Sequence, residues 1–341
     1  MRRREVLAAG LALPVGMGAT STGAAAAARA RAANPLVLQR ADPHILRQGG
    51  WYYFTGSVPE YDRVVLRRAR TIAGLATAPE VVIWQRPASG RMAGYIWAPE
   101  LHFFDGRWHI YFAAGDGDQK FRIRTYVLAS SDSNPTNAKW SLLGQLETPW
   151  DTFTLDCTSF AHRGRRYLCW AQTEPGIATN SNLYLAPIDT PTTLAAQPVR
   201  LTVPTLEWEV QGYKVAEGPA VLARNGRLFL TYSGSATDAR YCMGMLTARA
   251  DADIMDAGNW AKSPVPVFAS SDRNSVYGPG HNSFVVDERA RDLLVYHGRD
   301  YREIAGNPLF DPNRHARVQP IRYRPDGTPD FGEPVANGPL I

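Results

Sequence analysis

Five similar short segments recur along the chain at nearly equal spacing. Each is rich in aromatic and β-branched residues, which is typical of a β-strand. The segments are Trp51–Phe54, Trp108–Phe112, Tyr167–Trp170, Leu228–Tyr232 and Leu293–Tyr296. Their last aromatic residues lie 58, 58, 62 and 64 residues apart. An internal repeat of this length is the signature of an array of similar structural units, and it restricts the fold more than any single element does.

A turn precedes each of these strands. The turns are Gly49-Gly50, Asp105-Gly106, Arg163-Gly164, Asn225-Gly226 and the segment 287–291. Asp-Gly and Asn-Gly favour a two-residue hairpin, because both central positions of such a turn require positive φ. No apolar pattern with a period of 3.6 residues is sustained, so we expect no long helix.

Further strands fit between the hairpins, so each unit holds about four antiparallel strands. A unit of this kind repeated radially is a propeller blade. We therefore predict an all-β chain in which residues 34–341 form a five-bladed β-propeller. A β-sandwich is the alternative, but it does not explain five nearly equal periods. The fifth unit ends close to Ile341, so we expect no further domain after it.

The N-terminal residues 1–33 read as an export signal. An arginine-rich start is followed by the apolar run from Val6 to Met17 and then by small residues. This order is typical of a secretory signal, and the paired arginines favour the twin-arginine route. The apolar run is too short for a permanent membrane helix. We expect cleavage near Ala30-Arg31-Ala32 and a secreted protein without a membrane anchor. A disordered alanine-rich tail is the alternative.

The net charge of +5 resides mainly in this N-terminal segment. Residues 1–32 contain five arginines and one glutamate, so the remainder carries about +1. This near-neutral remainder lacks the basic surface expected of a nucleic-acid-binding protein. Cys157, Cys169 and Cys242 form no metal-binding motif. Two of them, such as Cys157 and Cys169, can form a disulfide in an exported protein, or all three can be buried free thiols.

The strand before each hairpin turn should line the central axis of the propeller. On these strands, one polar residue per unit lies 12 to 15 residues before the marker aromatic. These residues are Asp42, Glu100, Asp156, Glu217 and His281. We expect them to occupy nearly equivalent positions and to point toward one end of the axis.

Several carboxyl groups in one cleft cannot all ionise at their usual pKa, because like charges raise the pKa of at least one of them. Glycoside hydrolysis uses such a difference, with one carboxylic acid as proton donor and one carboxylate as base. Glu217 lies in an apolar strand that would raise its pKa, so it suits the acid. Asp42 suits the ionised base, and Asp156 can tune Glu217. A wide axial cleft favours the inverting geometry, with roughly 6.5–9.5 Å between the carboxyl groups.

The chain resembles glycoside hydrolase family 43, whose members are five-bladed propellers that hydrolyse arabinans and xylans with inversion. The matching motifs, in this order, are Ala41-Asp42-Pro43-His44, Ile96-Trp97-Ala98-Pro99-Glu100-Leu101-His102, Leu155-Asp156, Ala216-Glu217-Gly218-Pro219 and Gly278-Pro279-Gly280-His281-Asn282-Ser283. The resemblance covers the whole chain after the signal. It implies Asp42 as general base, Asp156 as pKa modulator and Glu217 as general acid.

The resemblance also implies roles for other residues. Trp97 corresponds to an aromatic residue that faces the substrate, although a core tryptophan is the alternative. Arg317 corresponds to an arginine near the reactive sugar, or is a surface salt-bridge partner. His281 corresponds to an axial histidine beside an ion, often calcium, contacted through water, or is a hydrogen-bonded core histidine. Glu100 lies in a motif that looks structural and is left out of catalysis. No cofactor is expected for the reaction.

The motif around His281 favours an α-L-arabinofuranosidase that releases terminal arabinose from a plant cell-wall oligosaccharide or polysaccharide. A β-xylosidase and an endo-arabinanase are alternatives within the same fold. A carbohydrate-binding propeller without activity is the alternative from another class. Such a protein would repeat its binding residues in every blade, whereas the axial residues of this chain differ between units.

Overall fold

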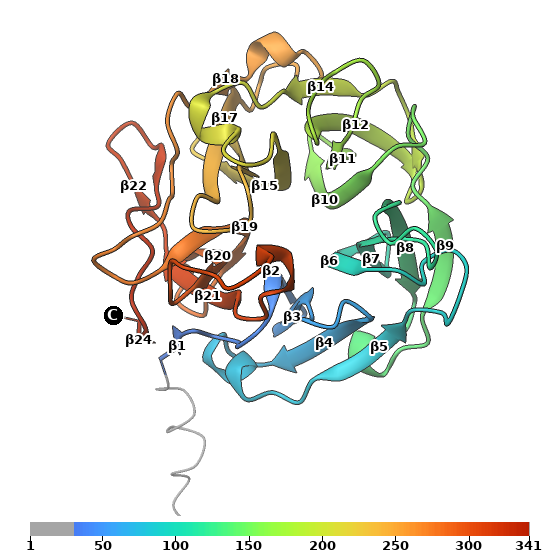
Figure 1. Ribbon diagram of the computed structural model, residues 1–341, viewed down its shortest axis with the longest axis horizontal. Coiled ribbons are helices and arrows are strands. Elements are labelled where there is room, and N and C mark those ends of the chain that lie inside the picture. The colour runs from blue at the N-terminus through green and yellow to red at the C-terminus, as the bar shows by residue number, and fades with distance from the viewer. Residues whose placement is uncertain (1–30, 341) are drawn as a thin grey trace, which may run out of the picture. The chain divides into compact units, whose positions relative to one another are not determined.

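Five antiparallel sheets surround one central axis in the computed structural model of the protein, which describes residues 31–340 (Figure 1). The residues from Ala32 onward form one compact unit. This arrangement is the predicted five-bladed β-propeller, and the β-sandwich alternative is wrong. The predicted export signal lies outside the described residues except for its last three positions, 31–33.

Each blade starts with its innermost strand and continues outward. Blade 1 contains β2 (Ala41–Gln48), β3 (Trp51–Ser57), β4 (Arg63–Ala69) and β5 (Val81–Gln85). Blade 2 contains β6 (Ile96–Phe104), β7 (Arg107–Ala114), β8 (Arg124–Ser130) and β9 (Ser141–Gln145). Blade 3 contains β10 (Thr154–His162), β11 (Arg165–Gln172), β12 (Asn182–Thr190), β13 (Thr193–Leu194) and β14 (Val199–Thr202).

The last two blades follow the same plan. Blade 4 contains β15 (Ala216–Arg224), β16 (Arg227–Gly234), β17 (Cys242–Arg249) and β18 (Ala261–Lys262). Blade 5 contains β19 (Tyr277–Val286), β20 (Asp292–Arg299) and β21 (His315–Pro320). Two small sheets lie outside the blades and pair β1 (Ala33–Asn34) with β24 (Gly338–Pro339) and β22 (Arg322–Tyr323) with β23 (Pro329–Asp330).

The residues directly before blade 1, from Asn34 to Val37, close the ring by pairing with the outer strand of blade 5. Val37 forms an antiparallel bridge with Ala316 of β21. The Asn34 side chain donates to the Val318 carbonyl at 2.8 Å and accepts from the Val318 amide at 2.9 Å. The beginning and the end of the propeller sequence are thereby joined, and β21 has a partner along part of its outer edge.

The predicted hairpin turns are confirmed. Both residues of Gly49-Gly50, Asp105-Gly106, Arg163-Gly164 and Asn225-Gly226 have φ between 48° and 77°. In the longer fifth turn, Ala290 has φ 61° and the Asp287 amide bonds the Arg291 carbonyl. Positive φ at both central positions gives the turn the twist of the flanking strands, which explains why glycine recurs there.

Buried side chains between and within the blades make up the core. The five marker aromatics, Phe54, Phe112, Trp170, Tyr232 and Tyr296, are all at most 1% exposed. Burial of one such side chain stabilises the fold by roughly 1.5–3 kcal/mol. The three cysteines are also buried and free, so the disulfide alternative is wrong and the free-thiol alternative is confirmed.

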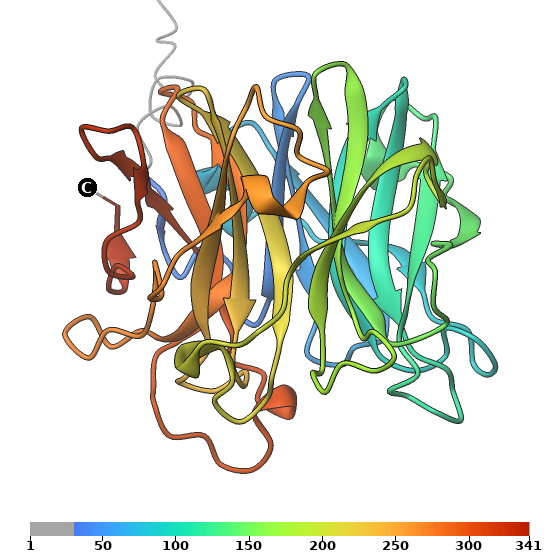
Figure 2. The same ribbon diagram turned by 90° about the horizontal axis from the view of Figure 1, so that it is seen from above.

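Five short 3-10 helices are the helical elements of the described residues. They are η1 (Ala73–Ala76), η2 (Pro135–Asn137), η3 (Glu207–Glu209), η4 (Ala257–Asn259) and η5 (Pro308–Phe310). Within residues 31–340, no helix has the length and apolar character needed to cross a membrane. Figure 2 shows long loops gathering at one end of the propeller, among them the orange-red loop between β20 and β21 that carries η5.

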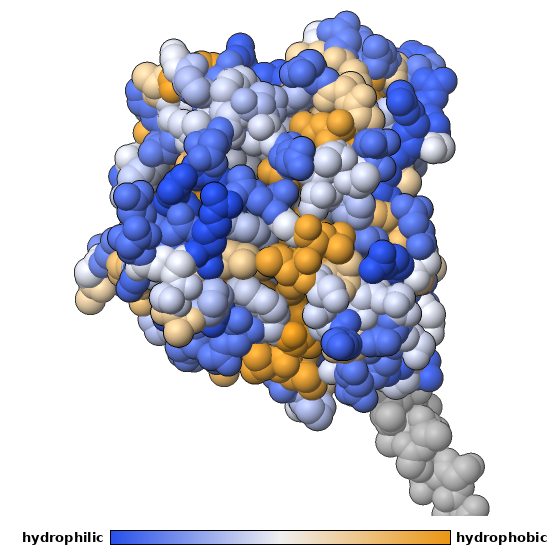
Figure 3. Space-filling view, turned by 90° about the vertical axis from the view of Figure 1, so that its right-hand side faces the viewer, coloured by the Kyte–Doolittle hydropathy of each residue, from blue (hydrophilic) through white to orange (hydrophobic). Residues whose placement is uncertain are grey.

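The outer strands leave some apolar side chains exposed. Leu142 and Leu143 of β9 are 43% and 39% exposed. β9 lies at the side of the molecule that faces the viewer in Figure 3, where hydrophobic residues form a band between hydrophilic ones.

Candidate active site

A β-bulge interrupts the innermost strand of every blade at the same register. In blade 1, for example, Ala41 pairs with Ser57 and His44 with Thr55, so two residues of β2 are left between these pairs. The first bulged residue of each blade has φ between 40° and 56°. These residues are Asp42, Ala98, Asp156, Gly218 and His281. Bulges re-aim side chains, and here they do so around one axis.

This register corrects the predicted equivalence of the axial residues. Asp42, Asp156 and His281 do occupy the same bulge position. Glu217, however, lies one residue before the bulged Gly218, and Glu100 lies two residues after the bulged Ala98. Glu100 is therefore displaced along the axis relative to the other carboxyl groups, because the count from the marker aromatics did not include the position of the bulge.

Asp42, Asp156 and Glu217 line one cavity of about 930 Å³. The same cavity is lined by His281, Tyr241, Arg314 and Trp97, and by the β20–β21 loop through Asn307, Pro308 and Leu309. The structure thus brings together the three predicted catalytic acids, the axial histidine and the predicted substrate-facing tryptophan.

Asp42 is buried and surrounded by hydrogen-bond donors and cationic or ionisable groups. Ser57 donates to Oδ2 at 2.5 Å. Around Oδ1 lie His281 Nδ1 at 3.3 Å, His297 Nδ1 at 3.4 Å and Arg314 Nη1 at 3.6 Å. Burial by itself raises the pKa of Asp42, but His281 and Arg314 outweigh it and hold this pKa well below its usual value. Asp42 is therefore a carboxylate at neutral pH.

His297 holds the Asp42 backbone. Its Nδ1 accepts a hydrogen bond from the Asp42 amide at 3.1 Å. Burial lowers the pKa of His297 to about 3, so the ring is neutral and this nitrogen carries a lone pair. The ring also stacks on Tyr241, with centroids 5.5 Å apart and an interplanar angle of 10°. His297 thus links the backbone of Asp42 to a residue that contacts Glu217.

Asp156 is bound to the backbone next to Glu217. Its Oδ2 accepts from the Gly218 amide at 3.0 Å and lies 3.6 Å from His281 Nδ1. Burial and the nearby Asp42 carboxylate raise the pKa of Asp156 well above its usual value, while the Gly218 hydrogen bond acts in the opposite direction. The position of this carboxyl group is therefore tied to the bulge that follows Glu217.

Glu217 is partly exposed to the cavity, whereas Asp42 and Asp156 are buried. The Tyr241 hydroxyl donates to Glu217 Oε1 at 2.9 Å. Burial raises the pKa of Glu217 to about 8, the Asp156 carboxylate adds to the increase, and the Tyr241 hydrogen bond opposes it. Of the three acids in the cavity, Asp42 is thus a carboxylate and Glu217 a carboxylic acid at neutral pH, and these two form the pair that acid–base catalysis needs.

Gly218 leaves room for His281 beside these acids. Gly218 has φ 56°, and a Cβ atom at this position would lie 3.0 Å from His281 Cγ. The backbone amide of His281 donates to the Ser233 hydroxyl at 2.8 Å. Residues with side chains accept this positive φ at the same bulge position in the other blades, so the close approach to the imidazole is what favours glycine after Glu217.

An aromatic wall forms one side of the cavity. Trp97 stacks on Tyr95 with centroids 5.4 Å apart and an interplanar angle of 12°. Phe121 lies edge-on to both rings and is 56% exposed. Trp97 lines the cavity and also packs in a buried cluster. Exposed aromatic surface at a cavity suits the apolar face of a sugar ring.

The structure places Arg317 away from the cavity. This side chain is 0% exposed, and its guanidinium pairs with Asp300 and donates to the Asn337 side chain. Arg314, three residues earlier, lines the cavity instead. The prediction that Arg317 binds substrate is therefore wrong in position. The motif contains two arginines: Arg314 directly precedes β21 and Arg317 lies within it, so their side chains have different surroundings.

Sequence reasoning also missed Tyr61, Tyr241, His297 and Arg314. The Arg314 Nη2 donates to the Tyr61 hydroxyl at 2.7 Å, so Tyr61 helps to hold the guanidinium beside Asp42. Tyr241 lies between β16 and β17 with no motif around it, whereas His297 of β20 directly follows the marker Tyr296. This place next to a marker residue is the sequence signal that could have identified His297.

Comparison with known proteins gives a consistent result. The family model of Glycosyl hydrolases family 43 matches residues 32–329. Alpha-L-arabinofuranosidase 43 of Humicola insolens is 56% identical over 309 residues, which cover 90% of this chain and 64% of that protein. An extracellular exo-alpha-(1->5)-L-arabinofuranosidase of Streptomyces avermitilis is 53% identical over 307 residues, which cover 89% of this chain and 64% of that protein. The chain thus matches 64% of the length of each of these relatives.

A solved structure extends the likeness to the fold. The crystal structure of an alpha-L-arabinofuranosidase from Lactobacillus brevis superposes with a TM-score of 0.87 at 50% sequence identity. The match covers 90% of this chain and 99% of that one. Sequence and backbone therefore agree over the whole propeller.

Proposed function

The chain belongs to glycosyl hydrolases family 43, and from this we propose that it is an inverting α-L-arabinofuranosidase that releases terminal arabinose. The observation that carries the proposal is that the pKa values of two acids in one cavity are shifted in opposite directions. Asp42 has a lowered pKa and Glu217 a raised one of about 8. Both relatives compared above, and the solved neighbour, are named as arabinofuranosidases.

In the proposed reaction a water molecule attacks the anomeric carbon. Asp42 takes a proton from this water as the new carbon–oxygen bond forms. Glu217 gives its proton to the glycosidic oxygen as the bond between that oxygen and the anomeric carbon breaks. One bond forms and one breaks in a single displacement, so the configuration at the anomeric carbon inverts.

The other groups around the acids support these two roles. Asp156 raises the pKa of Glu217 by its charge and, through the Gly218 amide, is held in a fixed position beside it. Tyr241 orients Glu217 through its hydroxyl. Arg314 keeps Asp42 ionised and lies in the cavity where it can also contact the bound sugar. We therefore assign the substrate-binding arginine to Arg314 rather than Arg317.

Release of a terminal sugar requires a cavity that is closed at one end, and we propose that the β20–β21 loop closes it. Pro308 and Leu309 line it from the β20–β21 loop. The buried Arg299 holds this loop by donating to the Pro308 carbonyl at 2.8 Å and pairing with Asp311 at 3.0 Å. The substrate class we propose is an arabinan-type oligosaccharide or polysaccharide with exposed α-L-arabinofuranose ends, whose next sugars extend toward Phe121.

Direct ligation of calcium by His281 does not fit the site residues, and an ion that His281 contacts through water stays a prediction. Calcium takes six to eight oxygen ligands. His281 Nδ1 instead faces the carboxyl groups of Asp42 and Asp156, which the proposed reaction uses. No step of this reaction involves an ion or an organic cofactor.

We further propose that the protein is exported by the twin-arginine route and acts outside the cell. The arginine-rich N-terminal segment and the name of the extracellular relative from Streptomyces avermitilis support this. Replacement of the arginine pair Arg3 and Arg4 by lysine should retain the protein inside the cell, as followed by immunoblots of medium and cell fractions. Equal secretion of both forms would contradict the route.

The activity is tested with the purified chain on nitrophenyl α-L-arabinofuranoside and nitrophenyl β-D-xylopyranoside. We expect arabinose release, which should fall by at least about 10³-fold in Asp42→Ala and in Glu217→Gln. Proton NMR in the first minutes should show the β-anomer of arabinofuranose. Xylose release alone would indicate a β-xylosidase. No release from either compound or from linear arabinan would indicate a carbohydrate-binding propeller.

A further inference from the structure

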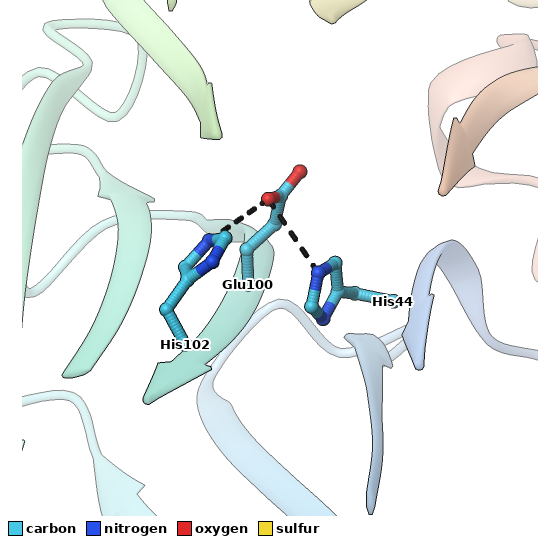
Figure 4. Close-up of side chains that lie close together, drawn as sticks. All are labelled: His44, Glu100 and His102. Carbon is cyan, nitrogen blue, oxygen red and sulfur yellow. Dashed lines mark hydrogen bonds and ion pairs between the residues drawn. The ribbon is translucent and has the colours of Figure 1, made fainter. Parts of the chain in front are cut away.

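Three metal-ligating side chains meet inside the propeller outside the catalytic cavity. His44 follows Asp42 by two residues on β2, and Glu100 follows Ala98 by two residues on β6, so both lie at the same level of the axis. His102 lies two residues further on the same face of β6. Figure 4 shows both imidazoles directed at one oxygen of Glu100.

The distances between these atoms suit a small tetrahedral ion. Glu100 Oε2 lies 3.1 Å from His102 Nε2 and 3.8 Å from His44 Nε2. One ligand atom from each residue lies within 4.8 Å of the others. Zinc bonds of 2.0–2.2 Å in a tetrahedron place ligand atoms about 3.3–3.5 Å apart. Shifts of a few tenths of an ångström would bring the two measured separations to this value.

The burial of the group adds an independent argument. His102 and Glu100 are buried, and the His44 side chain is 12% exposed. His44 Nδ1 has no hydrogen-bond partner among the described residues, and its Nε2 is too far from Glu100 for a hydrogen bond. A buried ring nitrogen without a partner is costly. An ion held by Nε2 would leave Nδ1 unpaired, but it would give the other ring nitrogen a ligand that it lacks among the described residues.

A cavity next to the group provides room for a further ligand. It has a volume of about 170 Å³ and is lined by His44, His102, Thr158 and Ser283, among other residues. None of the three ligating residues lines the catalytic cavity. The proposed hydrolysis uses none of His44, Glu100 and His102, so that reaction does not explain why these three side chains meet.

We propose that His44 Nε2, His102 Nε2 and Glu100 Oε2 bind a first-row transition metal ion of the zinc type. Two imidazole nitrogens and one carboxylate are ligands that zinc, nickel and copper accept. Calcium requires many oxygen ligands, and this group offers few. The ion joins β2 of blade 1 to β6 of blade 2, and its role is structural. The proposal does not rest on the glycosidase activity.

Metal binding to the chelator-treated, dialysed full chain tests the proposal. Equilibrium dialysis against zinc or calcium, with metal analysis of the protein, should give one tight zinc ion per chain and no tightly bound calcium. Cobalt in place of zinc should give the visible absorption of a tetrahedral site. Zinc at 100 times its dissociation constant should raise Tm by roughly 3–6 °C.

The variant His102→Gln should lose the tight zinc ion, the cobalt absorption and the Tm increase. His109→Gln is the matched control, because His109 pairs with His102 across β6 and β7 but is not part of the group. It should bind zinc like the wild type. If His102→Gln does not fold, His44→Gln takes its place, since His44 is more exposed.

Three results would overturn the proposal. The first is a wild-type chain that binds no zinc, or binds calcium more tightly. The second is zinc binding that persists in a folded His102→Gln or His44→Gln variant. The third is zinc binding that is lost in Asp42→Asn instead, which would place the ion beside His281 in the catalytic cavity. Each of these outcomes is independent of whether the chain hydrolyses arabinofuranosides.

Discussion

The ionisation of Asp42 should depend on Arg314, and the replacement Arg314→Gln measures this dependence. Arg314 Nη1 lies 3.6 Å from Asp42 Oδ1, and both side chains are less than 10% exposed. At an effective dielectric constant of about 20, two opposite charges at this distance attract by about 4.6 kcal/mol. This energy corresponds to about three pKa units. Neighbouring cations commonly lower a carboxyl pKa by about one to three units, so we expect an increase in this range.

The direction of the effect follows from the role of Asp42 as base. Activity requires the ionised form, so kcat/KM falls when the pH drops below the Asp42 pKa. In the wild type this acid limb lies far below the usual carboxyl range. Without the guanidinium it should move upward, toward the usual carboxyl range. The assay is kcat/KM on nitrophenyl α-L-arabinofuranoside as a function of pH, because this ratio reports the pKa values of the free enzyme.

The matched control is Arg317→Gln, which removes a buried arginine that pairs with Asp300 and does not line the cavity. Its acid limb should stay at the wild-type position. Because a lowered Asp42 pKa also stabilises the fold above the unfolded pKa, the melting temperature of each variant must be checked at the lowest pH used. If the acid limb of the pH profile stays in place in folded Arg314→Gln, the reasoning is refuted. If the limb moves only in Arg317→Gln, Arg317 is the arginine of the active site, as the sequence predicted.

Three further changes test other parts of the site. Asp156→Asn should lower the pKa of Glu217 below about 8 and move the alkaline limb of kcat/KM to lower pH. An unmoved limb would exclude Asp156 as modulator. Phe121→Ala should reduce kcat/KM for arabinan oligosaccharides by about 2–10-fold, which corresponds to the energy of one aromatic contact. Its kcat/KM for methyl α-L-arabinofuranoside should stay nearly unchanged. Equal losses on both substrates would show that Phe121 does not bind the later sugars. Gly218→Ala should lower the free energy of unfolding by about 1–3 kcal/mol in urea titrations, because the new Cβ would sit at positive φ and crowd the His281 ring. Wild-type stability would show that the bulge adapts.

The regular part of the fold could be predicted from the sequence. Asp105-Gly106 and Asn225-Gly226 specify their hairpins through their own backbone preferences, and the structure has positive φ at all four residues. The markers Phe112 and Trp170 recur because each blade buries the same strand. Such signals are local, since a turn and its two strands lie within about 20 residues of one another. Five equal periods then allow one architecture.

The acids of the candidate site could be found from short motifs, but their relative positions could not. Glu100 and Glu217 seemed equivalent by counting, yet the bulges place Glu217 before Gly218 and Glu100 after Ala98. One residue more or less in a bulge turns a side chain to another direction. The sequence does not mark where a bulge falls, because any residue that tolerates positive φ can start one.

Contacts between distant parts of the chain were decided by the tertiary structure alone. Arg314 reaches Asp42 and Arg317 does not, although both occur in the same motif. His297 holds the amide of Asp42 from 255 positions away. The sequence by itself determined the five blades, the hairpins and the identity of the three acids, because these follow from local backbone preferences and recurrent short motifs. Closure of the ring decided which cations and hydroxyl groups surround each acid, and thus which acid keeps its proton.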